Sequence, residues 1–583
     1  MTNKTTKQIP SAKPVKPNVF SVLKPYKLMI GCLIGFALLS NGVNLVIPKL
    51  ISHGIDDFSN GHFSYQRLIT QFLVAALIIL IFTFLQGILQ TYASERVARD
   101  LRSKLIDKIS RQTYRFIQEA NPSKLLTNLT ADIDSVKMFV SMAIVSLASS
   151  IFIIIGASIL LFSIDWKLAL SVLTIIPVIS GAFYFVFRKV RVLFKKSREV
   201  IDWLNKVISE SILGAALVRV LNSQTLEYNK FMDANTQAKD LGISILKLFA
   251  TLIPIVVFVS NMATLTILAL GGRFVINGTM TLGDFAAFNS YLVILIFPII
   301  VIGFISNFVV QASVSYTRIY DVLNAVETHD TGTVITPLKG NLELQNISVI
   351  YGDKPVLKNI SITIQAGSRT AVIGPTAAGK TQLLYLLTGL IQQTSGFILF
   401  DDINLNDYDK QNFQQQIGFV FQDSIMFNMS LRENIAFNDK VTDELMTKAI
   451  ETAELSDFIN SLPQGLDSIV SERGTSLSGG QKQRIMLARA LALNPKILLL
   501  DDFTARVDSQ TEEKILNNLT KNYPGITLLS VTQKIASVVH YGQILLLEEG
   551  ELLAKGTHES LMETSPEYVQ IFNSQRSTSI YEE

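Results

Sequence analysis

Six long stretches without a single Asp, Glu, Lys or Arg constrain the fold of this chain more than any other feature of its sequence. They occupy residues 28–48, 68–94, 139–164, 168–187, 248–272 and 285–317. Each has the ~20 residues that a helix needs to cross the hydrocarbon of a bilayer. A buried helix of a soluble protein could explain one such stretch, but not six in one half of a chain with only 17% charged residues. We therefore predict six membrane-spanning helices.

The N-terminal tail carries several lysines but does not have the layout of a signal peptide. The first apolar stretch is too long, and it follows a polar leader rather than a short basic region. We predict that this stretch is retained and that residues 1–17 are disordered. Residues 18–27 are expected to form a short amphipathic segment on the inner membrane surface, because Asn18 can cap a helical turn and Pro25 can end it.

Basic residues are concentrated in two of the connections between the apolar stretches. Residues 95–138 contain nine Lys or Arg and residues 188–198 contain six, whereas the other connections are short or poor in bases. Because basic loops stay on the cytoplasmic side, we predict that 95–138, 188–247 and both termini are cytoplasmic. The net charge of +3 follows from this topology and gives no reason to expect nucleic-acid binding.

The connections 95–138 and 188–247 are far longer than the ~2–8 residues that usually join packed helices. Each contains a helix breaker, Asn121-Pro122 in the first and Gly214 in the second. We predict that both connections extend membrane helices into the cytoplasm. The segment 123–129 and the region that follows Gly214 are expected to contact the C-terminal domain.

The chain changes character after Thr317. Residues 318–340 are predicted to form a linker, and from Asn341 short apolar strands alternate with helical segments. The wholly apolar run 497–500 is typical of a buried central strand in a parallel sheet. We predict one cytoplasmic α/β domain over residues 341–583.

A glycine-rich loop follows the predicted strand 370–373 and precedes the predicted helix 382–390. This strand, loop and helix order is what a phosphate-binding loop requires. The loop and the residue after it are Gly374, Pro375, Thr376, Ala377, Ala378, Gly379, Lys380, Thr381 and Gln382. Its amides and the start of the helix can bind the phosphates of ATP. Lys380 can reach the β- and γ-phosphates, and the Thr381 hydroxyl can ligate Mg²⁺.

Three residues outside the loop are expected to complete this ATP site. Asp501 ends the apolar strand 497–500 and is the expected outer carboxylate for Mg²⁺. Gln422 follows the predicted strand 417–421 and can reach both the metal and the attacking water. Tyr351 can stack on adenine, and a tyrosine packed in the core is the alternative.

A second site for an anion is predicted at the start of another helix, which continues through residues 482–491. The residues that open it are Leu477, Ser478, Gly479, Gly480 and Gln481. The amides at such a helix start can bind phosphate. One domain cannot wrap two such cradles around one nucleotide, so the second is expected to bind the nucleotide of a partner.

These motifs together resemble the nucleotide-binding domain of an ABC transporter, and the apolar stretches ahead of them resemble the membrane domain of an ABC exporter half-transporter. The resemblance extends from residue 18 to about residue 570. It implies a multi-domain membrane protein, with an all-α six-helix transmembrane domain followed by an α/β P-loop nucleotide-binding domain. It also implies head-to-tail dimers, in which two ATPs lie between one phosphate loop and the other subunit's Leu-Ser-Gly-Gly-Gln signature. Asp508 is then in the D-loop, and the tip 214–221 reaches the partner.

The chain departs from the family pattern at two catalytic positions. The family's general base is a glutamate, and here that position is Asp502, whose carboxylate falls roughly 1–1.5 Å short. The family's switch residue is a histidine, and here it is Gln533, which can donate a hydrogen bond to the γ-phosphate but cannot carry charge. With Gln422 these residues form the expected catalytic set, and we predict weak hydrolysis at this chain's own site.

The two departures favour one half of a heterodimeric bacterial multidrug exporter. The partner half-transporter is expected to supply the catalytic glutamate and the switch histidine. Uncharged polar and aromatic residues in the apolar stretches suit a small amphipathic or hydrophobic substrate that reaches the protein from membrane lipid. Two alternatives stay open: a homodimeric lipid flippase, and a regulatory subunit that binds ATP without pumping.

Overall fold

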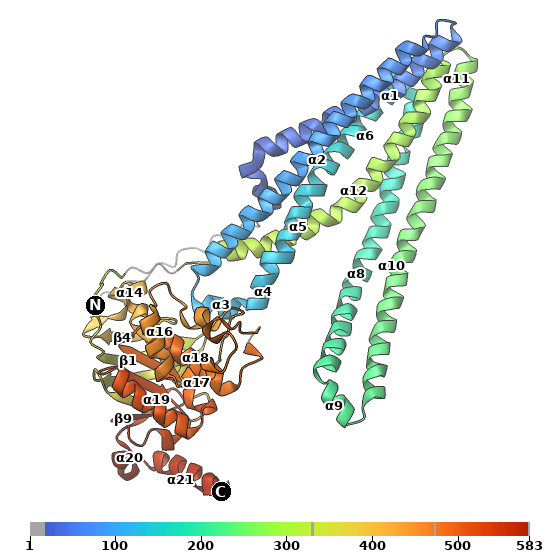
Figure 1. Ribbon diagram of the computed structural model, residues 1–583. Coiled ribbons are helices and arrows are strands. Elements are labelled where there is room, and N and C mark those ends of the chain that lie inside the picture. Colours follow the sequence, from blue (N-terminus) through green and yellow to red (C-terminus); the bar gives the residue numbers. More distant parts are fainter. Residues whose placement is uncertain (1–17, 328–331, 472–473, 581–583) are drawn as a thin grey trace, which may run out of the picture. The chain divides into compact units, whose positions relative to one another are not determined.

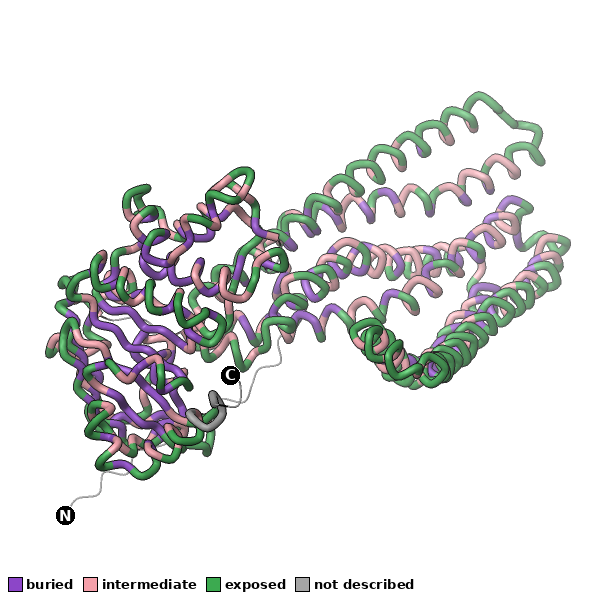
Figure 2. The backbone as a smooth tube through the Cα atoms, turned by 60° about the horizontal axis from the view of Figure 1, so that its bottom comes forward, coloured by how far each residue is buried: buried purple, intermediate pink, exposed green. Residues whose placement is uncertain are grey.

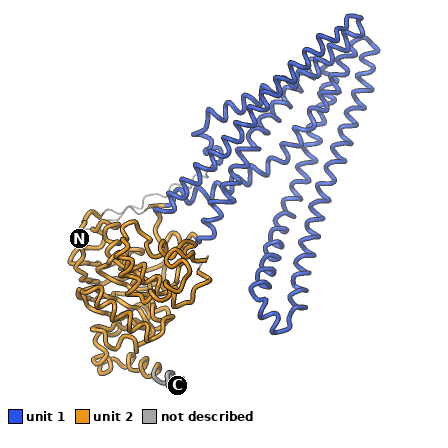
Figure 3. The backbone as a smooth tube through the Cα atoms, in the orientation of Figure 1, with its two compact units in different colours: residues 1–111, 121–325 blue, residues 112–120, 326–583 orange. Residues whose placement is uncertain are grey.

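The computed structural model describes residues 18–327, 332–471 and 474–580. The tail 1–17, for which the sequence predicts disorder, lies outside the described residues. Two compact units make up the chain (Figure 3). We call residues 1–111 and 121–325 the helical unit, and residues 112–120 and 326–583 the α/β unit.

The helical unit contains six helices that are long and apolar enough to cross a membrane, as counted over its described residues (Figure 1). These candidate spans are Val19–Ser59, Tyr65–Ser110, Pro122–Ile164, Trp166–Leu213, Gln224–Ile276 and Leu282–Leu323. Each contains one of the charge-free stretches, so the prediction of six spans is confirmed. Each is 41–53 residues long, about twice the ~20 residues that hydrocarbon requires. The helices therefore continue beyond the bilayer.

Helices and short helical turns are the elements of this unit. They are η1 (Val19–Tyr26), α1 (Lys27–Ser59), α2 (Tyr65–Ser110), α4 (Pro122–Thr127), η2 (Asn128–Asp132), α5 (Ile133–Met138), η3 (Phe139–Ala143), α6 (Ile144–Ile164), α7 (Trp166–Leu173), α8 (Ile175–Leu213), α9 (Ala215–Val220), α10 (Gln224–Thr266), η4 (Ile267–Gly271), α11 (Gly272–Ile276) and α12 (Leu282–Leu323). Asn18 accepts a hydrogen bond from the Phe20 amide and so caps η1, as its sequence predicts.

The helical unit packs around a core in which α6, α8 and α12 meet, and it leaves an apolar surface outside. Tyr291 is fully buried, and its hydroxyl donates to the carbonyl oxygen of Leu45 at 3.0 Å. Leu80 and Phe84, by contrast, are 65% and 66% exposed. Figure 2 shows that exposed residues run along the long helices, and on α10 they include Ile253, Val257 and Phe258. A surface of this kind is unfavourable in water and suits contact with lipid.

The end of α12 differs from the prediction. The helix continues to Leu323, so residues 318–323 of the predicted linker are helical. Ile319 and Val322 are buried there, and Arg318 forms an ion pair with the buried carboxylate of Asp132. These contacts hold the extra turns in place.

The α/β unit contains two sheets. The strands are β1 (Leu342–Tyr351), β2 (Lys354–Ile364), β3 (Arg369–Ile373), β4 (Ser395–Phe400), β5 (Ile403–Asn404), β6 (Ile417–Val420), β7 (Ile497–Asp501), β8 (Thr527–Val531), β9 (Gln543–Glu548) and β10 (Glu551–Gly556). One sheet has the order β2-β1-β4-β5 and is antiparallel. The other has the order β10-β9-β3-β8-β7-β6, and only its β10 edge is antiparallel. All residues of β7 are buried, as its apolar sequence predicts.

Helices cover both faces of the parallel strands (Figure 1). They are α13 (Lys380–Leu387), α14 (Lys410–Gln415), α15 (Leu431–Ile435), α16 (Asp443–Thr452), α17 (Ser456–Asn460), α18 (Gly479–Leu491), α19 (Ser509–Asn522), α20 (His558–Thr564) and α21 (Pro566–Ile580). One core lies between the parallel sheet and α16, α18 and α19, and a second joins both sheets around α13. The chain order brings the ends of β3, β7 and β8 to the same edge, where the candidate site lies.

A short helix from the first basic connection belongs to the α/β unit. This helix, α3 (Tyr114–Ala120), precedes Asn121-Pro122, whereas the sequence analysis placed the contact after that break, at 123–129. The Tyr114 ring packs edge-on against Tyr385 at 5.2 Å. Asn121 has a positive φ of 64° and ends α3, and Pro122 opens α4. The structure thus assigns the helix before the break to the α/β unit, and the contact predicted for 123–129 stays a prediction.

Candidate nucleotide site

The phosphate loop connects β3 to α13 and depends on two glycines. Gly374 has φ 148°, and a Cβ there would lie 1.9 Å from the carbonyl oxygen of Leu547. Gly379 has φ 95° and precedes the first residue of α13. A side chain at either position would strain or displace the loop. The backbone can therefore curl closely enough for its amides to face an anion at the helix start.

Lys380 is held inside the curl of this loop. Its ammonium group donates to the carbonyl oxygens of Gly374 and Pro375, both at 2.8 Å, and the residue is only 8% exposed. Burial lowers the pKa of Lys380, while the nearby carboxylates of Asp502 and Asp501 act in the opposite direction. A cation held without a direct carboxylate partner is well prepared to meet a phosphate.

Asp501 lies at the end of β7 next to the first turn of α13. The Thr381 hydroxyl donates to its Oδ1 at 3.2 Å, whereas its Oδ2 is buried and has no hydrogen-bond partner among the described residues. Burial raises the pKa of Asp501 to about 6. An unpartnered carboxylate oxygen beside a hydroxyl is a suitable beginning of a Mg²⁺ site, because this ion takes few protein ligands and shares phosphate oxygens.

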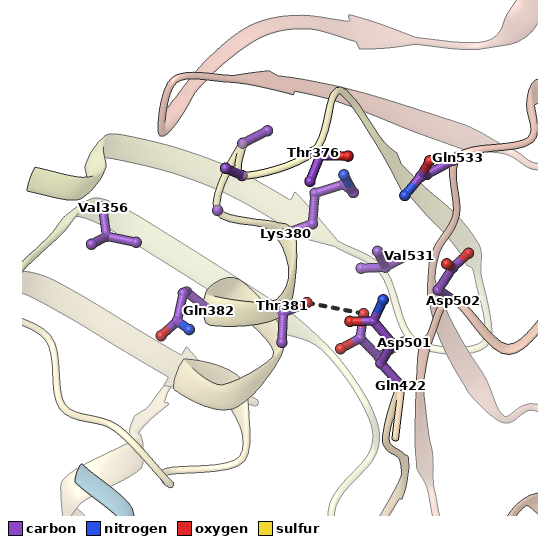
Figure 4. A pocket seen from close by; sticks show the side chains of 13 residues that line it. Val356, Thr376, Lys380, Thr381, Gln382, Gln422, Asp501, Asp502, Val531 and Gln533 are labelled. Atoms are coloured by element: carbon purple, nitrogen blue, oxygen red, sulfur yellow. Dashed lines mark hydrogen bonds between the residues drawn. The ribbon is translucent and has the colours of Figure 1, made fainter. Parts of the chain in front are cut away.

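A cavity of about 320 Å³ brings together residues from five separate parts of the chain (Figure 4). Its lining residues are Val356, Thr376, Ala377, Ala378, Gly379, Lys380, Thr381, Gln382, Gln422, Asp501, Asp502, Val531 and Gln533. The phosphate loop forms one side of it, and Asp502 and Gln533 form the other. The structure therefore brings the predicted metal and catalytic residues and most of the phosphate loop into one cavity, while Gly374 and Pro375 do not line it.

The backbone holds Asp502 in the left-handed region, with φ 50°. Its amide donates to the carbonyl oxygen of Val531 at 2.9 Å. Burial raises the pKa of its carboxyl, and the charges of Lys380, Lys534 and Arg506 oppose that shift. The short side chain is thus fixed at its root, and only its own two torsions can change its reach.

Gln533 follows β8, and its backbone carbonyl oxygen accepts a hydrogen bond from a residue that the sequence did not single out. Gln575, on α21, donates to the Gln533 carbonyl oxygen at 2.6 Å. The same carboxamide accepts a hydrogen bond from the Ile535 amide at 3.0 Å. No sequence signal marks Gln575, because a glutamine on a helix has no pattern that ties it to the segment after β8, where Ile535 lies 40 residues away.

Tyr351 does not line this cavity. Its hydroxyl donates to Oε1 of Gln382 at 2.8 Å, and Gln382 does line it. The Arg115 guanidinium, from α3, lies 5.2 Å from the centre of the Tyr351 ring. The tyrosine is therefore next to the site but engaged by an arginine, a contact that the sequence did not reveal because the two residues are far apart along the chain.

The signature residues Leu477 to Gln481 are also outside the cavity. Ser478 caps α18 through a capping box, in which its hydroxyl accepts from the Gln481 amide and the Gln481 side chain accepts from the Ser478 amide. A Cβ on Gly480 would lie 2.9 Å from the carbonyl oxygen of Arg506. Asp508 caps α19 by accepting from the Thr511 amide at 2.9 Å. The signature thus packs against Arg506, two residues before the D-loop aspartate, and none of its residues lines the cavity.

Two family models match this chain. Residues 30–299 match the ABC transporter transmembrane region, and residues 357–505 match the ABC transporter family. Together they cover more than half of the chain, which belongs to the ABC transporters. Its fusion of a membrane domain with an ATP-binding domain makes it an exporter-type half-transporter. Membership implies ATP binding and ATPase-coupled transport by a multi-pass membrane protein.

Relatives with assigned names support this placement. The chain is 32% identical over 564 residues to the "Uncharacterized ABC transporter ATP-binding protein YfiB" of Bacillus subtilis, covering 95% of this chain and 98% of that one. It is 30% identical to an "ATP-dependent lipid A-core flippase" of Syntrophus aciditrophicus, with coverage of 84% and 82%. It is 29% identical to the "Multidrug resistance-like ATP-binding protein MdlA" of Buchnera aphidicola, with coverage of 95% and 97%.

A solved structure has the same fold. It is a bacterial Atm1-family ABC exporter with ATP bound, and it superimposes with a TM-score of 0.79. The match covers 95% of this chain and 99% of that one at 22% sequence identity.

Proposed function

We propose that this chain is one half of a heterodimeric exporter and that its own ATP site binds nucleotide but hydrolyses it poorly. The observation that carries the proposal is the pair Asp502 and Gln533 on one side of the cavity. Both positions lack the group that the family uses for hydrolysis, while the phosphate loop opposite them is complete.

Asp502 is a poor general base for reasons of reach. A base must lie within hydrogen-bond distance of the water that it activates, and small displacements cost large factors in rate. The left-handed backbone and the amide hydrogen bond to Val531 fix the root of this side chain. The strand end therefore has little freedom to advance the carboxylate by the length of the missing methylene.

Gln533 cannot compensate for this shortfall. Its carboxamide can donate one hydrogen bond toward a γ-phosphate, but it brings no positive charge to the transition state. Lys534, the next residue, influences the pKa of Asp502 through its charge but does not line the cavity. The hydrolytic side of this site thus lacks both a well-placed base and a switch residue able to become cationic.

Mg²⁺ would be held by Thr381, Asp501 and Gln422. A bound Mg²⁺ supplies charge neutralisation to the phosphate oxygens. Thr381 and Asp501 are already joined by a hydrogen bond, so the chain's own residues fix the metal side of the site before nucleotide arrives.

The partner would use this chain's signature. The signature residues pack against Arg506 and do not line the cavity of the chain's own phosphate loop. The tip α9 has exposed apolar side chains on both of its flanks, with Leu213 85% and Val220 82% exposed. We infer that this tip inserts into the ATP-binding domain of a partner half-transporter that carries the catalytic Glu and the switch His.

The transported compound is proposed to be amphipathic or hydrophobic. One relative is named as a multidrug resistance-like protein and another as a lipid A-core flippase, and both substrate classes partition into membranes. The six spans would lie in the bacterial cell membrane, with the α/β unit and the basic connections on its cytoplasmic side. A homodimeric lipid flippase is the second candidate, and the flippase-named relative is what favours it.

One experiment separates the two candidates. The chain is purified alone and with a half-transporter that carries the catalytic glutamate, and Mg-ATP turnover is measured for each. We expect weak turnover alone and strong turnover in the complex. Turnover by the single chain at the rate of an ordinary symmetric exporter would contradict the proposal and favour the homodimeric flippase.

A further inference from the structure

A small cavity lies in the helical unit where η1 runs into α1 and meets α2. It has a volume of about 250 Å³. Its lining includes Tyr26, Leu28, Met29, Arg96, Asp100 and Lys104. It therefore joins the short N-terminal amphipathic segment to the basic end of the second span, and the nucleotide chemistry described above makes no use of it.

The cavity lies at the level where two apolar stretches end. The charge-free stretch of α1 begins at Leu28, and that of α2 ends at Ser94. Leu28 is 83% exposed and Phe20, on η1, is 50% exposed. Apolar side chains that point outward at the end of a span contact lipid tails, whereas basic residues just beyond it lie among headgroups.

The charged lining is arranged for an anion. Arg96, Asp100 and Lys104 recur every four residues and so share one face of α2. The Asp100 carboxylate is already satisfied, because the Tyr26 hydroxyl donates to its Oδ2 at 2.6 Å and Arg99 donates to its Oδ1 at 2.9 Å. Within the described parts of the chain, Arg96 and Lys104 form neither a hydrogen bond nor an ion pair. Two cations are thus left to face the cavity.

We propose that this cavity binds the phosphate headgroup of an anionic membrane lipid. Arg96 and Lys104 contact the phosphate, and Leu28 and Met29 contact the upper part of the acyl chains. The tyrosine–aspartate hydrogen bond keeps the one carboxylate of the cavity turned away from the phosphate. In the cytoplasmic orientation that the basic connections predict, the lipid comes from the inner leaflet, where anionic headgroups attract such residues.

The apolar half of the cavity is what favours a lipid over a free phosphate compound. A soluble anion needs only the two cations and gains nothing from the apolar side chains of Leu28 and Met29. A lipid contacts the two cations with its phosphate and the apolar side chains with its acyl chains. It also stays anchored in the bilayer, so its local concentration at the cavity is high. The position between η1 and α2 lets the lipid join the N-terminal segment to the second span.

Native mass spectrometry of the full-length protein tests the proposal. The protein is titrated with phosphatidylglycerol and, separately, with phosphatidylcholine of the same acyl chains, and retained lipid is counted. We expect tighter retention of phosphatidylglycerol. Arg96→Gln/Lys104→Gln weakens it roughly tenfold, because each base contributes to attraction at an anionic surface. The matched control Lys195→Gln/Lys196→Gln removes the same charge from exposed positions on α8 and leaves retention unchanged.

Asp100→Asn provides a change of opposite sign. It removes the one negative charge of the cavity while keeping an acceptor for Tyr26, so phosphatidylglycerol retention rises severalfold. Equal retention of both lipids, equal losses in the double variant and its control, or no gain in Asp100→Asn would each overturn the proposal. Binding of glycerol 3-phosphate in solution as tightly as the lipid would overturn the lipid assignment in favour of a free phosphate compound.

Discussion

The two sides of the ATP cavity differ in how firmly the chain holds their side chains. Lys380 and Asp501 are 8% and 1% exposed, and both form hydrogen bonds to the phosphate loop or its helix. Asp502 and Gln533 stand opposite them, and over the described residues neither of these two side chains makes a hydrogen bond. The phosphate-loop side is therefore fixed by contacts within the fold, whereas the hydrolysis that we propose for this site would depend on two side chains that could change without disturbing those contacts.

The largest effect is expected on the binding side. Lys380→Ala removes the only lysine that lines the cavity, as defined by the residues that the structure describes there. Because hydrogen bonds to charged groups contribute about 1.5–3 kcal/mol each, nucleotide affinity at this site falls roughly a hundredfold or more. Binding of a fluorescent ATP analogue measures it. Lys514→Ala, on the exposed face of α19, is the control, and undiminished binding in Lys380→Ala would contradict the assignment of the loop.

The next effect falls on the hydrolytic side. Asp502→Glu restores the missing methylene and raises turnover at this site about tenfold, below the 10²–10⁴-fold that a well-placed base supplies, because Gln533 still limits it. Adding Gln533→His raises turnover further, and nucleotide affinity stays the same in both variants. Single-turnover hydrolysis in the complex with a partner whose own glutamate is replaced by glutamine isolates this site. A lower nucleotide affinity in either variant would contradict the idea that one side of the cavity binds nucleotide and the other side only hydrolyses it.

Sequence alone predicted the binding side better than its surroundings. The six spans, the order of strand, loop and helix at residues 370–390, and the buried strand before Asp501 follow from local pattern, and the structure contains them. The position of α3 did not follow, because Asn121-Pro122 indicates where a helix breaks but not which side of the break makes contact. The hydrogen bond from Gln575 to the Gln533 carbonyl oxygen could not be predicted either, since it depends on where α21 packs in the tertiary structure.

Asp501 gives the binding side a pH dependence. Burial raises its pKa to about 6 from the ordinary 3.8, so the protonated form favours the fold. That stabilisation is fully present below pH 3.8 and is lost as the pH rises through about 6. Mg²⁺ needs the ionised form, so the Mg²⁺ concentration for half-maximal ATP binding is about fourfold higher at pH 5.5 than at pH 7.5. In Asp501→Asn, ATP binding should depend less on Mg²⁺, and the half-maximal Mg²⁺ concentration should be the same at pH 5.5 and pH 7.5. The same fourfold change in the variant would assign the pH dependence to another group.

The smallest effect is expected from a variant that tests whether backbone hydrogen bonds after β8 hold Gln533 in position. Gln575→Ala removes the hydrogen bonds to the Gln533 carbonyl oxygen and the Ile535 amide, each of which contributes about 1 kcal/mol. We expect turnover in the complex to change about twofold, because the segment after β8 loosens while the phosphate loop is untouched. Gln570→Ala, at an exposed position of α21, is the control and leaves turnover unchanged. If Gln575→Ala instead lowered nucleotide affinity as much as turnover, α21 would support both sides of the cavity, and binding and hydrolysis would not be separately encoded.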